Sequence, residues 1–85
     1  MKIWKYEIPA SGAGILEIPE GAKLLDVQVQ GGVPCVWALV NPAAPAVGRE
    51  FSTYETGQLL PDDTGDYLAT YQIPEEDLVF HVFTT

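Results

Sequence analysis

The sequence predicts an all-β fold, a compact antiparallel sandwich or a partly closed barrel of about six or seven short strands. Apolar residues recur with a period near two in almost every segment, and no stretch keeps the 3.6-residue period of a helix. Seven prolines and eight glycines divide the chain into short pieces. The 85 residues are expected to form a single domain, 1–85, because a chain of this length builds one hydrophobic core.

The first 30 residues of the chain contain three predicted strands. Alternating residues over 3–8 indicate an opening strand, and those over 15–18 indicate a second one after a turn. A third strand at 24–30 has valine and leucine on one face and glutamine on the other, which is typical of a half-buried strand. Gly31 and Gly32 supply the positive φ angles of a two-residue hairpin turn, so this strand is expected to pair with the next.

The next predicted strand, 33–40, is apolar on both faces and must therefore be covered twice. Pro34 lacks an amide hydrogen, so the strand is expected to start after it or to begin at a sheet edge. The segment 41–48 contains two prolines and is predicted to be a crossing loop, the longest connection in the chain. Three further strands are predicted at 51–55, 67–73 and 78–83. The last of these is again apolar on both faces.

Charge and composition exclude several classes of partner. Twelve acidic and four basic residues give a net charge of −8, which repels phosphate backbones and anionic lipids, so neither nucleic acid nor a membrane is expected as a direct partner. No apolar run approaches the ~20 residues that span a bilayer, and residues 1–12 lack the apolar core of a signal peptide. The single cysteine excludes an internal disulfide framework. A cytoplasmic location is therefore predicted.

The sequence predicts no catalytic residue, metal site or cofactor, and hence no enzyme. His81, the only histidine, is interpreted as a satisfied core or interface residue rather than a general base or metal ligand. Asp62, Asp63 and Asp66 surround a glycine, a pattern that favours a solvated turn over a Ca²⁺ loop. Cys35 has no basic neighbour that would activate it as a nucleophile, so it is interpreted as buried filler. Hydrolase and phosphate-loop motifs are absent.

The candidate binding residues are aromatic or charged. The aromatic side chains exceed what one small core accommodates, so some are expected at an interface or pocket. Arg49, the only arginine, suits a carboxylate or phosphate ligand, or else an ion pair with a surface acid such as Glu50 or Glu55. An acidic run after Pro74 is a candidate docking patch or a solvated loop. The predicted binding set is Trp37, Arg49, Tyr54, Glu75, Glu76, Asp77 and His81.

Three segments carry a resemblance to a known family: IPEGAKLLDVQVQ at 18–30, PCVWALVNP at 34–42 and VFHVF at 79–83. They resemble small uncharacterised proteins from phages and prophages, and the likeness extends through most of the chain. The resemblance implies an accessory protein of a mobile element. Small acidic phage proteins often antagonise host enzymes or bacterial immunity, so the resemblance implies that class of activity by association.

These observations favour a non-enzymatic, phage-encoded binding protein that antagonises a host defence component, an anti-CRISPR or similar, through an acidic and aromatic surface. One alternative is a homo-oligomeric sponge that sequesters a small immune-signalling nucleotide, and another is a virion structural accessory protein. A homo-oligomer is expected because two predicted strands, 33–40 and 78–83, are apolar on both faces in a chain too small to cover them itself.

Overall fold

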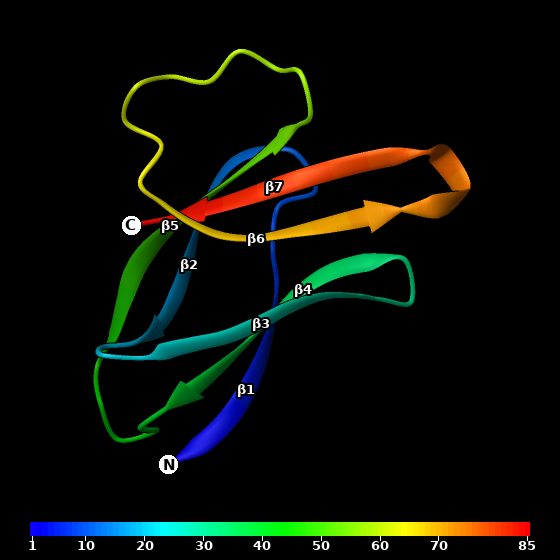
Figure 1. Ribbon diagram of the computed structural model, residues 1–85. Coiled ribbons are helices and arrows are strands. Elements are labelled where there is room, and N and C mark those ends of the chain that lie inside the picture. The colour runs from blue at the N-terminus through cyan, green and yellow to red at the C-terminus, as the bar shows by residue number, and fades with distance from the viewer.

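The computed structural model describes residues 1–85 as two antiparallel sheets that pack face to face (Figure 1). Sheet A has the strand order β1 (Lys2–Glu7), β4 (Val33–Val40), β3 (Lys23–Gln30). Sheet B has the order β2 (Gly12–Pro19), β5 (Ala46–Glu55), β7 (Leu78–Thr84), β6 (Asp66–Ile73), and a 3-10 turn, η1 (Pro74–Glu76), joins β6 to β7. The predicted all-β fold of about six or seven strands is confirmed, and of its two forms, a sandwich or a partly closed barrel, the structure has the sandwich, because the two sheets do not close into a barrel.

The hairpin between β3 and β4 has the predicted turn. Gly31 and Gly32 have φ angles of 59° and 80°, and Gln30 lies opposite Val33 at the end of the ladder. Both turn residues thus have the positive φ that a type I′ turn requires, which a side chain would disfavour.

No helix in the structure has the length and apolar character needed to cross a bilayer.

The structure corrects the predicted loop at 41–48. Strand β5 already begins at Ala46, because Pro42 and Pro45 both precede it and every later amide is free to join the ladder with β2. The loop therefore ends at residue 45. The longest connection is instead the segment 56–65, which joins β5 to β6.

The structure distinguishes the two expectations for Pro34: the strand does not start after it, but the strand does begin at a local sheet edge, because the pairing of β4 with β1 starts only at Cys35. Pro34 lies inside β4, the central strand of sheet A. Its carbonyl accepts a hydrogen bond from the Ile8 amide at 3.1 Å, on the β1 side. Since the N and C=O of one residue in an antiparallel ladder point to the same neighbour, the missing N–H also faces β1. Strand β1 ends at Glu7, so the ladder with β3 loses no bond.

The core lies between the two sheets and is small. Only 15 of the 85 residues are buried, and the molecule measures 40 × 31 × 15 Å, so both outer faces are large relative to the interior. Side chains from both sheets meet in the largest buried cluster. Its members are Ile8, Val27, Val36, Phe51, Tyr71 and Val82.

Stability is expected to fall at alkaline pH because of Tyr71. Its ring is 6% exposed and stacks on Phe80 with centroids 5.5 Å apart, and burial raises the pKa of its phenol. A group whose pKa is higher in the folded state contributes its full stability below the unfolded pKa of about 10, and loses it as the pH rises further.

Denaturant unfolding measured from neutral pH to above about pH 10 checks this expectation. The Tyr71→Phe variant keeps the ring and should lose less stability over the same range. Burial also raises the pKa of Tyr6, so part of the alkaline loss should remain in that variant. Identical alkaline losses in both proteins would show that Tyr71 does not cause the effect.

Candidate docking face on the four-stranded sheet

The outer face of sheet B carries a row of three aromatic rings, here called the aromatic row: Tyr54, Phe83 and Tyr67. Side chains alternate along a strand, and Val82 points into the core, so its neighbour Phe83 in β7 points outward. Its ring centroid lies 5.9 Å from that of Tyr54 in β5 and 5.8 Å from that of Tyr67 in β6. Both pairs are edge-to-face, with interplanar angles of 65° and 72°. This geometry is favourable for aromatic pairs.

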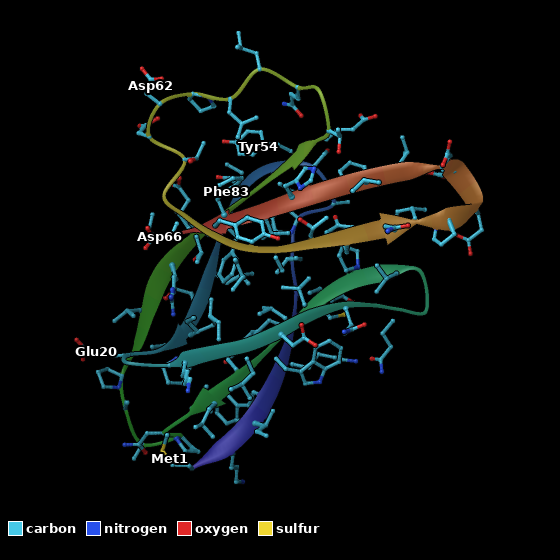
Figure 2. The ribbon with its side chains drawn as sticks, viewed as in Figure 1. Met1, Glu20, Tyr54, Asp62, Asp66 and Phe83 are labelled. Carbon is cyan, nitrogen blue, oxygen red and sulfur yellow. The ribbon has the colours of Figure 1, made fainter.

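The members of the aromatic row differ in accessibility. Tyr67 is 60% exposed, whereas Tyr54 and Phe83 are half-buried. Figure 2 shows Tyr54 and Phe83 beside the segment 56–65, which leaves the sheet after β5 and returns to begin β6. Tyr67 is therefore the most accessible ring of the row.

A chain of hydrogen bonds leads to Tyr67 from the neighbouring strands. Thr56 Oγ1 lies 2.7 Å from His81 Nε2, and Thr70 Oγ1 lies 2.9 Å from His81 Nδ1. The Tyr67 hydroxyl is 2.8 Å from Thr70 Oγ1. Both ring nitrogens of His81 are thus hydrogen-bonded.

The tautomer of His81 sets the direction of this chain, because a neutral imidazole has one N–H. When Nδ1 carries the proton it donates to Thr70, which in turn donates to Tyr67 and leaves the phenol hydrogen free. When Nε2 carries the proton, the Tyr67 hydroxyl donates to Thr70 and presents its oxygen as an acceptor. The site is therefore able to offer a partner either a donor or an acceptor at the same position.

Negative charge is concentrated on sheet B and its loops. Of the four basic residues only Arg49 belongs to this sheet, and all three lysines belong to sheet A. The nine acids on sheet B and its loops, out of twelve in the chain, are Glu17, Glu50, Glu55, Asp62, Asp63, Asp66, Glu75, Glu76 and Asp77.

Some of these acids border the aromatic row. Figure 2 shows Asp62 and Asp66 at the same end of sheet B as Tyr54 and Phe83, and Asp66 directly precedes Tyr67 in β6. Asp63 lies in the same loop as Asp62. We call these three acids together with the aromatic row the docking face. Carboxylates beside aromatic rings attract cations both by charge and by the negative potential of the ring faces.

The structure brings only two of the predicted binding residues together. Tyr54 and His81 are directly opposite each other in the β5–β7 ladder. Trp37 lies in sheet A, and the acidic residues 75–77 lie at the turn between β6 and β7, at the other end of β6 from the docking face. The sequence interpretation missed Tyr67, Phe83 and the two threonines as partners of this pair. Alternation relative to the buried Val82 and Tyr71 identifies Phe83 and Thr70 as outward-facing. It does not identify Tyr67, which the irregularity between Tyr67 and Ala69 turns outward, or Thr56, which follows the end of β5.

Arg49 has a structural role that the sequence did not predict. Its Nε donates to the Thr85 carbonyl at 2.9 Å, and its Nη1 donates to the Ala22 carbonyl at 3.1 Å. The guanidinium thus holds the end of the chain and the turn before β3 against β5. An ion pair of Arg49 with Glu50 or Glu55 was expected. The guanidinium instead donates to main-chain oxygens.

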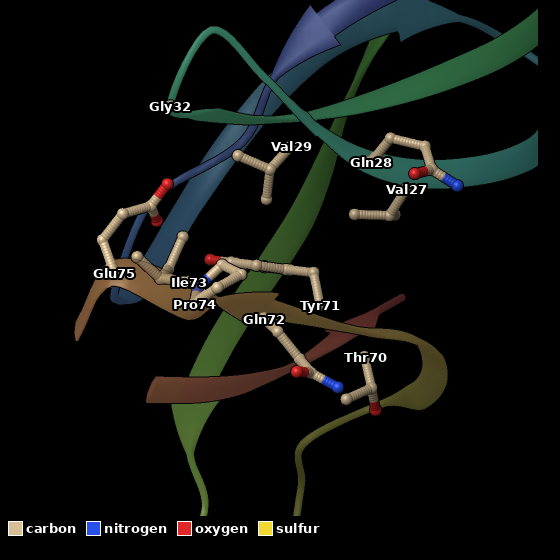
Figure 3. Close-up of a pocket in the computed structure, with 10 residues that line it drawn as sticks. All are labelled: Val27, Gln28, Val29, Gly32, Thr70, Tyr71, Gln72, Ile73, Pro74 and Glu75. Atoms are coloured by element: carbon tan, nitrogen blue, oxygen red, sulfur yellow. The ribbon is translucent and has the colours of Figure 1, made fainter. Parts of the chain in front are cut away.

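A pocket of about 580 Å³ lies between the edge strands β3 and β6 (Figure 3). Val27, Val29 and Tyr71 contribute apolar surface to it, and Glu75 lies at one end. Its lining contains no lysine, arginine or histidine, so it offers no cation to a phosphate group. No group of three histidine, cysteine or acidic side chains is placed to hold a metal ion.

Fold and surface define the chain as an acidic, two-sheet antiparallel β-sandwich domain with one aromatic outer face. A family model for a domain of unknown function, DUF7352, matches residues 1–85, and the chain belongs to this family. Comparison with curated proteins and with solved structures gave no match.

Proposed function

We propose that this chain is a non-enzymatic, phage-encoded accessory protein that works in the cytoplasm of the bacterial host. It binds a basic surface of a host defence protein, a CRISPR component or one of similar role, and blocks that surface. The observation that carries this proposal is the concentration of nine acids on sheet B and its loops, three of them beside the aromatic row, whose Tyr67 is exposed. Acidic groups accelerate the encounter with a basic partner, and aromatic rings supply the apolar contact that holds it.

The docking face suits a lysine or arginine side chain of such a partner. The Tyr67 ring is accessible to a cation, and Asp66 is its neighbour in the chain. With the proton on Nε2 of His81, the Tyr67 oxygen also accepts a hydrogen bond from the cation. One basic side chain is thereby able to meet a ring, a carboxylate and a hydroxyl oxygen together.

The alternative of a nucleotide sponge receives less support. Arg49 already donates to two carbonyls, and the pocket between β3 and β6 has no cationic residue. A nucleotide needs positive groups for its phosphates, whereas the exposed charges of sheet B are almost all negative. No specific feature of the structure favours a virion structural role over the blocking of a host defence protein.

The proposal is tested by producing the protein in bacteria that carry a CRISPR or other defence system and by measuring the plating efficiency of a targeted phage. The protein should restore plating. Substituting Asp62, Asp63 and Asp66 with asparagine should abolish much of this effect, because it removes the charge beside the aromatic row.

The matched control removes the same charge at the other end of β6, by Glu75→Gln, Glu76→Gln and Asp77→Asn. This variant should keep most of the activity, and binding of wild type to its captured host protein should weaken steeply with salt. Equal losses in both triple variants would indicate a net-charge effect without a defined face. Absence of any protection against the defence systems tested would reject the proposal.

A further inference from the structure

The outer face of sheet A is complementary to itself, and we propose that two copies of the chain dimerise through it about a two-fold axis parallel to β4. The key feature is a row of three outward-facing residues across the sheet. Lys5 in β1 and Asp26 in β3 both lie opposite Trp37 in the central strand β4. A lysine, a tryptophan and an aspartate therefore occupy neighbouring strand positions at intervals of about 4.8 Å, the spacing of neighbouring strands.

The order of charges in this row selects the orientation of the axis. A two-fold axis along β4 exchanges the two sides of the sheet but keeps positions along the strand. It places Lys5 opposite the partner's Asp26, places Asp26 opposite the partner's Lys5, and brings the two Trp37 rings together. An in-plane axis perpendicular to β4 would instead place Lys5 opposite the partner's Lys5, which is repulsive.

The neighbouring row of residues is compatible with the same axis. Glu7 and Gln28 both lie opposite Cys35, so the axis places Glu7 opposite an amide donor, the partner's Gln28. Cys35 itself is 1% exposed and lies below this surface.

The charged groups already lie close to this face in the single chain. Lys5 Nζ donates to Gln30 Oε1 at 2.6 Å, and since this bond joins β1 to β3, the lysine side chain extends across β4. Asp26 Oδ2 accepts from Gln28 Nε2 at 2.9 Å, and its Oδ1 accepts from the Val27 amide at 2.8 Å. Asp26 is therefore held in place before association, which reduces the entropy lost on binding, whereas Lys5 exchanges Gln30 for the partner's Asp26 when the dimer forms.

The distribution of charge explains why sheet A, and not sheet B, is the dimer surface. Two copies joined through sheet B would bring together two sheets that, with their loops, each carry nine acids and one arginine, whereas the strands of sheet A carry three lysines and only two acids, Glu7 and Asp26. Apolar side chains are also accessible on sheet A, including Ile3 at 60% and Val33 at 36% exposure. Joining sheet A to sheet A leaves a docking face pointing outward on each copy, so the dimer is bivalent.

The test uses charge reversal and measures molecular mass by sedimentation at several protein concentrations. Wild type should form a dimer. Lys5→Glu and Asp26→Lys should each raise the dissociation constant about tenfold or more, because each change turns two attractive contacts into repulsive ones. A 1:1 mixture of the two single variants should recover the dimer, since each cross-contact then joins opposite charges.

The control is Glu17→Lys, which makes the same change in net charge as Asp26→Lys but on β2 of sheet B, and which should leave the dimer intact. Circular dichroism of each variant confirms that it is folded. If Asp26→Lys is unfolded because the Val27 amide loses its acceptor, the double variant Lys5→Asp with Asp26→Asn replaces it, and this variant should not self-associate. The proposal would be overturned by a wild type that stays monomeric at about 100 μM, the scale of a weak Kd, or by a mixture of folded single variants that stays monomeric.

Discussion

Replacing Phe51 with alanine is expected to lower the free energy of unfolding by about 3–5 kcal/mol, the range for removing a large ring from a well-packed core. Phe51 is 0% exposed and belongs to the cluster that joins the two sheets. A domain of this length has only about 4–13 kcal/mol of stability in total. The variant should therefore be largely unfolded near physiological temperature, which circular dichroism and urea titration measure directly.

The matched control for this prediction is Ile15→Ala on the outer face of the same sheet. Ile15 is 65% exposed in β2, next to β5, so its truncation removes little buried area and should change stability by less than about 0.5 kcal/mol. A loss at Ile15 as large as the loss at Phe51 would mean that the outer face of sheet B is covered in solution. In that case the docking face described above would be incorrect.

Local periodicity was sufficient to predict most of the strands and one complete hairpin. The alternation over 24–30 predicts its strand, and the pair Gly31-Gly32 predicts the hairpin turn, from local sequence alone. Both the face on which a side chain lies and the type of a two-residue turn depend on residues that are adjacent in sequence. Proline was over-interpreted in the loop at 41–48, because Pro45 lies before the first residue of β5. Pro34 directs its missing N–H toward the side on which β1 has ended, which agrees with the expected edge position. Whether a proline breaks a ladder depends on which neighbour it faces, and that is a tertiary property.

The candidate site was only partly predictable for a related reason. Periodicity shows which residues share a face within one strand, but it does not show which strands become neighbours. Tyr54 and His81 are 27 positions apart in sequence and meet only because β5 pairs with β7. Trp37 lies apart from these two residues because β4 belongs to the other sheet. Charge segregation between the sheets is likewise visible only when the strand order is known.

The accessible ring of the docking face is expected to dominate binding to the host partner. Tyr67→Ala removes the ring and should weaken binding about 30-fold or more, the effect of losing an interface residue worth about 2 kcal/mol. Tyr67→Phe keeps the ring but loses the hydroxyl that bonds to Thr70, so it should retain most of the affinity. Binding to the captured host protein, measured by calorimetry for wild type and both variants, checks this order.

The comparison between the two substitutions separates ring contact from hydrogen bonding. If Tyr67→Phe loses as much affinity as Tyr67→Ala, the hydrogen-bond chain through His81 and Thr70 carries the recognition, and His81→Ala should then produce an equal loss. If neither substitution at Tyr67 weakens binding while neutralising the acidic residues 75–77 does, the partner occupies the turn between β6 and β7. The aromatic row would then serve only to hold β5, β7 and β6 together, through the edge-to-face contacts of Phe83 with its two tyrosine neighbours.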